Sequence, residues 1–391
     1  MAEDQQDTTQ AQQDKTTPLH DEHVALGASL TGFGGWLMPL RYTSDLAEHR
    51  AVREAAGLFD LSHMGEIHLE GAGSGAALDQ ALVGKASAIG VGRARYSMIC
   101  AEDGSVLDDL IVYRLADEHF LVVANAGNAP RVAAELVARS AGFDTVVTDR
   151  SAETALVAVQ GPQAEEIVAS LTADGDVATV RGMRYYASAE ATVAGIGVLL
   201  ARTGYTGEDG FELFVPADRA VELWRALLAA GEGRGLVPAG LSARDSLRLE
   251  AGMPLYGHEL DETTTPYEAG LGRVVKLDKT GADGAPLPFV GRDALAARAQ
   301  SEPARVLVGL RGEGRRPARA GYDVVQRDLD GGVGAVVGHV TSGAPSPTLG
   351  YPVAMAYVTP EVSAEGTALA VDVRGRAEPF VVVPLPFYRR A

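Results

Sequence analysis

The sequence predicts an α+β fold that ends in a small all-β unit. Up to about residue 280, pairs of antiparallel strands alternate with helices, which is the α+β pattern. A Gly- and Pro-rich stretch at 281–289 then indicates a linker. Beyond residue 299, short apolar runs separated by turn residues predict a small barrel or sandwich. These runs are 305–311, 321–326, 333–341, 352–358, 367–374 and 380–383.

Local signals place the elements of the first region. Thr17-Pro18 precedes a helix expected over 20–28, and a second helix is expected from Ser44 to Gly57. Asp103-Gly104 predicts the turn of a β-hairpin. The other expected elements are strands at 66–69, 95–101, 106–114, 120–123, 153–160 and 196–201, and helices at 73–83, 129–140, 163–171 and 219–230.

Length and composition favour more than one domain. The 391 residues exceed the usual size of one domain, and a 46% hydrophobic share supplies side chains for more than one core. The expected divisions are a disordered polar tail at 1–16, an α+β region at 17–285 and a C-terminal β-barrel domain at 286–391.

The chain is strongly acidic, because 52 Asp and Glu oppose 34 Lys and Arg, for a net charge of −18. Such a surface repels phosphate groups, which argues against nucleic acid and against anionic membranes as partners. The imbalance is uneven. Residues 302–391 hold 10 Arg and 9 acids and sum to +1, so residues 1–301 carry −19.

The sequence predicts a cytoplasmic protein. Residues 1–17 contain no apolar segment of a signal peptide, and no apolar run approaches the ~20 residues of a membrane span. The single cysteine, Cys100, fits a reducing compartment. Because it lies in the apolar run YSMIC, a buried small hydrophobe is favoured over a nucleophile.

Two patterns carry weak signals. Residues 71–76 match GxGxxA, but the next segment is predicted to be antiparallel, so a simple strand-to-helix turn is favoured over a dinucleotide site. His20 and His23 lack a third ligand at metal spacing, so exposed histidines are favoured over a metal site. His63 and His68 are out of phase along a strand and are not expected to face one site.

Asp108-Asp109 interrupts an apolar strand. Successive side chains on a strand point to opposite faces, so one carboxylate is expected to face solvent and the other to point into the fold. An inward carboxylate is costly without a partner and can accept protons from a ligand. The alternatives are a protective edge-strand charge and, with Asp103, a magnesium site.

Three further segments are candidates for ligand contacts. The segment RTGYTGEDGFE (202–212) allows a tight glycine loop, and Glu212 can accept two parallel N–H bonds from a heterocycle. Arg244, in a helix at 240–252, can pair with a carboxylate inside the fold or anchor an anionic ligand. Tyr185-Tyr186 is a core pair or flanks a flat ring.

Together, ten ordered strings resemble the aminomethyltransferase (T protein) family of the glycine cleavage system over nearly 375 residues. The strings are TPLHDEHVALGA (17–28), FGGWLMPLRY (33–42), GLFDLSHMGE (57–66), LDDLIVY (107–113), VVANAGN (122–128), VQGPQA (159–164), RTGYTGEDGFEL (202–213), GLSARDSLRLEAGMPLYGHELDETTTP (240–266), VGHVTSGAPSPTLG (337–350) and PFYR (386–389).

The resemblance implies a fold and a reaction. The fold is a three-domain arrangement around a central folate-binding cavity, with two interleaved subdomains at 17–285 and a C-terminal barrel. The reaction transfers the methylene carbon of an aminomethyl group, carried on the lipoyl arm of the H protein, to the co-substrate tetrahydrofolate. Its products are 5,10-methylenetetrahydrofolate, ammonia and the dihydrolipoyl H protein. No metal is implied.

The resemblance also assigns roles to residues. Asp109 matches the acid beside the reactive folate nitrogens, and Glu212 matches the carboxylate that binds the pterin's amino-pyrimidinone edge. Arg244 matches an arginine near the glutamyl end of the folate or in the pocket wall. The positions expected to line the folate are Met64, Tyr96, Asn125, Tyr185, Tyr186 and Tyr205.

The chain departs from the family pattern at Arg273, where many members have an aromatic residue, and it ends soon after PFYR, so Arg389 receives no role. Related folds remain as alternatives: a tetrahydrofolate-dependent demethylase or a non-catalytic folate-binding protein. The intact LDD segment and the complete loop at 202–213 disfavour them. For a ligand with glutamyl carboxylates, Arg244 and the segment 302–391 are the expected anion and docking contacts.

Overall fold

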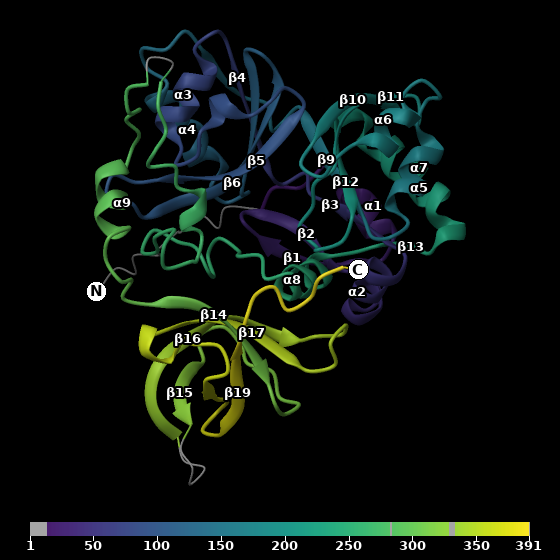
Figure 1. Cartoon of the computed structure of the whole chain (residues 1–391). Helices are drawn as coiled ribbons and strands as arrows, with labels where there is room; N and C mark the ends of the chain where they lie inside the picture. Colours follow the sequence, from purple (N-terminus) through teal and green to yellow (C-terminus); the bar gives the residue numbers. More distant parts are fainter. Residues whose placement is uncertain (1–13, 282–283, 328–332, 391) are drawn as a thin grey trace, which may run out of the picture.

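The structure is a computed structural model that describes residues 14–281, 284–327 and 333–390. Two halves that each combine a sheet with helices lie side by side, and a β-barrel lies beneath them (Figure 1). Most of the predicted tail at 1–16 falls outside the described residues. Lys15, within the described part, forms an isolated parallel β-bridge with Trp36 through the backbone. None of the described helices is long and apolar enough to cross a membrane.

A five-stranded antiparallel sheet with the order β5-β6-β7-β4-β8 forms the first half. The predicted Asp103-Gly104 hairpin is confirmed, since β5 and β6 pair across this turn and Gly104 has a φ of +85°. The strands are β4 (Gly65–Glu70), β5 (Arg93–Cys100), β6 (Val106–Ala116), β7 (His119–Ala124) and β8 (Val146–Asp149), and the helices are α3 (Ser74–Ala81) and α4 (Ala129–Arg139).

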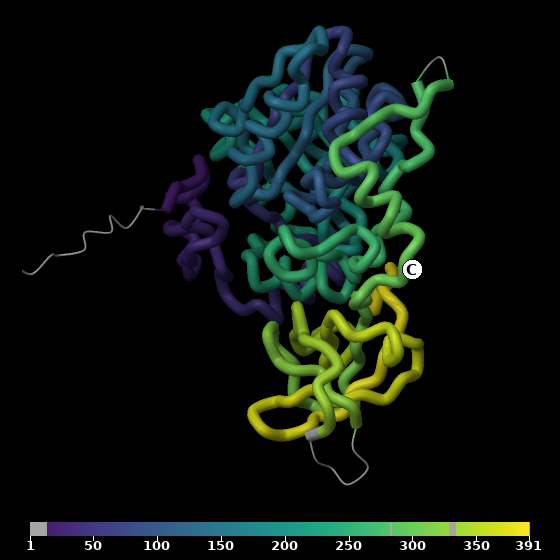
Figure 2. The backbone as a smooth tube through the Cα atoms, turned by 90° about the vertical axis from the view of Figure 1, so that its left-hand side faces the viewer, coloured from purple at the N-terminus to yellow at the C-terminus, as the bar shows by residue number. Residues whose placement is uncertain are grey.

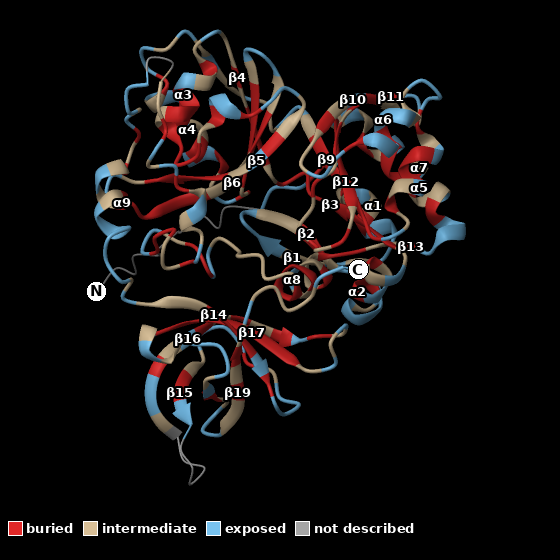
Figure 3. Ribbon diagram, in the orientation of Figure 1, coloured by how far each residue is buried: buried red, intermediate tan, exposed pale blue. Residues whose placement is uncertain are grey.

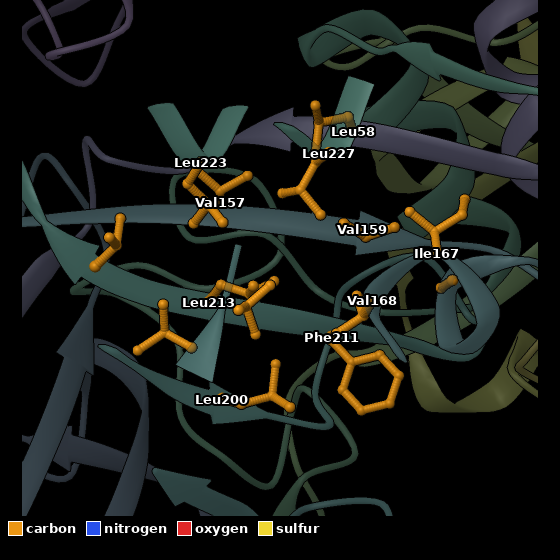
Figure 4. Packing of buried hydrophobic residues seen from close by; sticks show 14 of the residues in the cluster. Leu58, Val157, Val159, Ile167, Val168, Leu200, Phe211, Leu213, Leu223 and Leu227 are labelled. Carbon is orange, nitrogen blue, oxygen red and sulfur yellow. The ribbon is translucent and has the colours of Figure 1, made fainter. Parts of the chain in front are cut away.

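A six-stranded sheet with the order β10-β11-β12-β9-β3-β13 forms the second half. Its apolar face packs on α5 and α7 through side chains such as Leu213, Ile167 and Leu223 (Figure 4). The strands are β3 (Ala56–Asp60), β9 (Thr154–Gln160), β10 (Ser188–Val193), β11 (Ile196–Ala201), β12 (Gly210–Pro216) and β13 (Leu236–Pro238). The helices are α1 (His20–Ala25), α5 (Ala164–Leu171), α6 (Val177–Gly182) and α7 (Ala220–Gly231).

The chain passes between the two sheets rather than completing one before the other. Strand β3 precedes the whole five-stranded sheet in sequence, yet it pairs with β9 and β13 of the six-stranded sheet. A third apolar cluster lies where the sheets meet and includes Leu121, Tyr113, Leu156 and Phe214. Figure 3 shows that the central strands β3, β9 and β12 are buried.

The C-terminal region is a closed barrel with the strand order β14-β17-β16-β15-β18-β19. This confirms the barrel, one of the two predicted all-β forms, and each predicted apolar run overlaps one strand. Closure pairs β14 with both β17 and β19. The strands are β14 (Val306–Gly312), β15 (Asp323–Arg327), β16 (Val333–Pro345), β17 (Pro352–Val358), β18 (Ala368–Asp372) and β19 (Ala377–Val383).

Connecting elements join these three parts. The hairpin of β1 (Ser29–Phe33) and β2 (Trp36–Arg41) and the helices α2 (Asp45–Glu54) and α8 (Leu241–Glu250) lie near the centre of Figure 1. The helix α9 (Arg292–Arg298) lies on the edge opposite the N-terminal segment in Figure 2. The linker expected at 281–289 includes residues 282–283, which are outside the described residues.

Several sequence-based expectations are wrong. The second helix ends at Glu54, and Gly57 lies inside β3 because its backbone pairs with Gln160 and Val237. His23 is fully buried rather than exposed, since its Nε2 lies 2.8 Å from the carboxylate of Asp60. The short strands β8 and β13 were not predicted, because each forms through pairing with residues far along the chain.

The weak motifs find structural explanations. Residues 71–73 form a strand-to-helix turn between the antiparallel strand β4 and α3, and residues 74–76 begin α3, as favoured from the sequence. A Cβ on Gly71 would lie 2.4 Å from the Asp144 carbonyl oxygen, so the turn needs glycine there. Cys100 is buried, as expected, and burial raises the pKa of its thiol to about 12.

Candidate functional site

A cavity of about 530 Å³ lies between the two sheets, and the cavity is closed on another side by α8 and the segment 252–256. It contains eight of the nine residues expected at the site. These are Met64, Tyr96, Asp109, Asn125, Tyr186, Tyr205, Glu212 and Arg244. They come from strands and loops of both halves, which explains why no short sequence window contains the set.

Tyr185 is the ninth residue, and the structure does not place it in the cavity lining. Its side chain is 40% exposed and packs edge-on against Tyr186, with ring centroids 4.9 Å apart. Tyr186 does line the cavity, and it has a φ of +59°, a region that bulky residues seldom adopt. Backbone hydrogen bonds to Arg202 and Ala94 hold this conformation. Tyr185 thus supports the cavity wall from behind.

The expectation that one of Asp108 and Asp109 faces solvent is wrong, because Asp108 is fully buried and Asp109 lines the cavity. Asn125, just beyond β7, joins them. Its amide nitrogen donates to Asp108 Oδ1 at 2.8 Å and to Asp109 Oδ1 at 2.9 Å. Asp108 also accepts from the backbone N–H of Asn125 and from Asn128, at 3.0 and 2.8 Å. Asp108 therefore fixes the loop that carries Asn125.

Burial raises the pKa of Asp109 to about 6 and, together with the charge of Asp109, raises the pKa of Asp108 to about 7. Tyr96 donates to Asp109 Oδ2 at 3.0 Å, which opposes the rise. Within the described ranges, neither carboxylate has a cationic partner. Asp109 can therefore hold or release a proton near neutral pH, as a group that moves protons at a reacting atom must.

Glu212 presents one carboxylate oxygen to the cavity. Tyr113 and Thr203 donate to Oε2, with the Tyr113 hydroxyl at 3.4 Å. Oε1 accepts no hydrogen bond from any part of the chain that the structure describes, and burial raises the pKa of Glu212. The anchored Oε2 and the open Oε1 suit a carboxylate that accepts an N–H group of a ligand.

Arg244 extends from α8 into the same cavity. Its guanidinium carbon lies 4.7 Å from the centroid of the Tyr205 ring. Among the residues with described positions, none forms a hydrogen bond or ion pair with the Arg244 guanidinium. An arginine in a cavity without a protein partner is placed to bind an anionic group. The alternative of a carboxylate partner inside the fold is not what the structure has.

The glycine loop brings backbone close to the cavity. A Cβ on Gly204 would lie 2.0 Å from Gln160 Oε1, so any larger residue there would require the Gln160 side chain to move. Tyr205, the next residue, donates its hydroxyl to the Pro254 carbonyl oxygen at 2.5 Å. This contact joins the loop to the segment that closes the cavity.

The positions of Arg273 and His63 relative to the cavity could not be predicted from the sequence. Arg273 is exposed and lies outside the cavity lining, which instead includes Leu271 from the same segment. His63 lines the cavity, although the sequence assigned it no site. His68 faces elsewhere and contacts His119 at 2.8 Å, so the expectation that the two histidines do not share a site is confirmed.

Comparisons with known proteins agree with this architecture. The family model of the GCVT N-terminal domain matches residues 19–279, and that of the glycine cleavage T-protein C-terminal barrel domain matches residues 305–389. These matches define the class as a GCVT-type domain joined to its barrel. The chain belongs to the family of glycine cleavage T proteins, the aminomethyltransferases.

Individual relatives support the same assignment. Aminomethyltransferases of Streptomyces avermitilis and Saccharopolyspora erythraea are each 59% identical, cover 96% of this chain and are themselves covered to 97% and 98%. The crystal structure of glycine cleavage system aminomethyltransferase T from Bartonella henselae is 38% identical, with a TM-score of 0.85, and covers 96% of this chain and 98% of its own. The similarity thus extends over both regions of the chain.

Proposed function

We propose that this glycine cleavage aminomethyltransferase transfers the methylene carbon of an aminomethyl group, carried by the lipoyl arm of an H protein, to tetrahydrofolate. The products are 5,10-methylenetetrahydrofolate, ammonia and the dihydrolipoyl H protein. The observation that carries the proposal is the shared cavity of Asp109, Glu212 and Arg244. In this proposal residues 17–285 bind the ligands, and residues 286–391 form the barrel domain.

The cavity fits a folate by the chemistry of its side chains. The open oxygen of Glu212 matches the N–H groups of an amino-pyrimidinone ring, and the unpaired guanidinium of Arg244 matches an anionic group. Met64, Tyr186 and Tyr205 supply apolar surface for flat rings. A volume of about 530 Å³ is within the usual range of small-molecule sites.

Asp109 is the group that moves protons in this proposal. Its carboxylate accepts hydrogen bonds from Tyr96 and Asn125, so its orientation is set before a ligand enters. In the ionised form it accepts a proton from the folate nitrogen that attacks the aminomethyl carbon. Its raised pKa keeps proton exchange easy near neutral pH.

The deciding experiment combines the purified chain, tetrahydrofolate and lipoylated H protein charged with the aminomethyl group. Ammonia and methylenetetrahydrofolate are followed together and are expected in equal amounts. Omitting either partner should stop both. Folate binding without ammonia release would identify a passive binder, and turnover of a methylated substrate without H protein would identify a demethylase.

A further inference from the structure

His63 is a buried polar side chain in the cavity that forms no hydrogen bond with any described residue. It lies in the loop between β3 and β4 and is 2% exposed, yet it lines the cavity. Its Nδ1 atom is buried without a hydrogen bond, and no hydrogen bond to either ring nitrogen forms within the described residues. Buried polar groups nearly always have partners, so such an exception in a ligand cavity needs a cause.

The neighbours of His63 do not supply that partner. Asp60 is close, but its carboxylate already accepts hydrogen bonds from Thr17 and Ser62 and contacts His23 at 2.8 Å. Phe33 contacts the imidazole edge to face, with centroids 5.7 Å apart. The protein thus holds the ring in place through packing and leaves its polar atoms unused.

The two ring nitrogens differ in access. Nδ1 is sealed from solvent, whereas Nε2 is not among the sealed polar atoms of this cavity-lining side chain. Burial, together with the charge of Arg244, outweighs the opposing charge of Asp60 and lowers the pKa of His63 to about 4, so the ring is neutral at pH 7 and carries one proton. A buried N–H without an acceptor is costly, so the proton belongs on Nε2, the accessible nitrogen.

We propose that His63 is a positioning residue that donates its Nε2–H to an oxygen acceptor of the bound tetrahydrofolate. The proposal rests on the proposed function, because it takes the folate as the ligand of this cavity. His63 and Arg244 supply hydrogen-bond donors to the ligand, while Asp109 and the open oxygen of Glu212 supply acceptors. A ligand that satisfies both sets has a single orientation, which is how a cavity places one reactive nitrogen near one carboxylate.

Three substitutions at the same position test the hydrogen bond. The amide nitrogen of glutamine reaches about as far as Nε2, that of asparagine only about as far as Nδ1, and phenylalanine keeps a ring without a donor. We expect His63→Phe and His63→Asn to weaken tetrahydrofolate binding about 10-fold, the typical effect of one hydrogen bond. His63→Gln should bind within about 3-fold of the wild type. His68→Gln, outside the cavity, is the matched control.

Calorimetry with tetrahydrofolate measures these affinities, and steady-state kinetics should show a raised KM for folate together with a lowered kcat, because the reactive nitrogen is oriented less well toward Asp109. Equal affinities of His63→Phe and the wild type would overturn the proposal, and so would a His63→Gln variant as weak as His63→Asn. If one variant does not fold, the remaining pair still decides. A wild-type chain that binds no tetrahydrofolate would instead refute the proposed function.

Discussion

Glu250 and Asp109 show how hydrogen-bond and charge partners determine the pKa of a carboxyl group inside the protein. Glu250, at the junction of α8 with the barrel, is fully buried and contacts Arg53 at 2.9 Å and His49 at 3.2 Å. It also accepts hydrogen bonds from Ser346 and Thr348 of the barrel region. Asp109, in the cavity, accepts hydrogen bonds from just two described side chains, those of Tyr96 and Asn125, and both are neutral.

The pKa values of the two carboxyls are shifted in opposite directions. Burial raises the pKa of both carboxyls. At Glu250 the hydrogen bonds and the charge of His49 outweigh that effect and hold the pKa at about 2, whereas at Asp109 the pKa rises to about 6. The contacts of Glu250 join α8 to the barrel. No described cation pairs with Asp109, so its carboxyl can exchange protons near neutral pH.

The largest expected effect comes from removing Asp109. Asp109→Ala should lower aminomethyl transfer by about 10³-fold or more, because the group that moves the proton is lost. The melting temperature should stay the same or rise, since no cation of the described ranges pairs with this carboxylate and would be left unpaired. Joint measurement of ammonia and methylenetetrahydrofolate checks this. A folded variant with near-normal transfer would contradict the role of Asp109.

Glu250→Ala should mainly lower stability, whereas Asp109→Ala should mainly lower activity. Loss of this carboxylate leaves Arg53 buried without one of its partners, so the free energy of unfolding should fall by about 3–5 kcal/mol in denaturant titrations. The wild-type contribution should be present above pH 4.5 and be lost as the pH falls toward 2, because the folded pKa lies below the ordinary value. Glu313→Ala, which breaks an exposed pair with Arg327, should cost at most about 1 kcal/mol.

The barrel, the cavity and the junction around Glu250 could be predicted from the sequence to different extents. The barrel strands were predictable because apolar runs and turns are local signals. Asp109 and Glu212 were candidates because carboxylates in apolar strands are unusual, whereas the grouping of the site residues depended on the family resemblance. The junction was not predictable, since Glu250 and Thr348 are 98 positions apart. The sequence assigned His63 no site, because it was compared with His68 by strand phase, which says nothing about whether a loop residue faces a cavity.

A smaller effect is expected from removing Glu212, which also lines the cavity. Glu212→Ala should weaken tetrahydrofolate binding by roughly 1.5–3 kcal/mol, about 10- to 150-fold, because a charged acceptor is removed. Calorimetry gives the affinity directly. Glu208→Ala is a nearby comparison, because Glu208 contacts Arg53 at 2.9 Å and does not line the cavity. Equal tetrahydrofolate affinities of Glu212→Ala and the wild type would rule out the contact.

The smallest expected effect concerns Asn125. Its substitution removes hydrogen bonds to Asp108 and Asp109 without removing a charged group. Its amide lowers the pKa of both Asp108 and Asp109, so Asn125→Ala should raise both values. If ionised Asp109 is the base, kcat/KM of the wild type rises with pH through about 6 to 7, and the two carboxyls titrate as a coupled pair.

In Asn125→Ala that rise should move to higher pH by about one unit, the equivalent of one lost hydrogen bond. The pH profile of kcat/KM between pH 5 and 9 measures the displacement, and Asn128→Ala, which loses a donor to Asp108 alone, should move it less. A profile displaced to lower pH would mean that the protonated form of Asp109 is the active one. The cavity would then use its unpaired carboxyl as an acid, and the contrast with Glu250 would be sharper, because only a carboxyl without a cation can stay protonated near neutral pH.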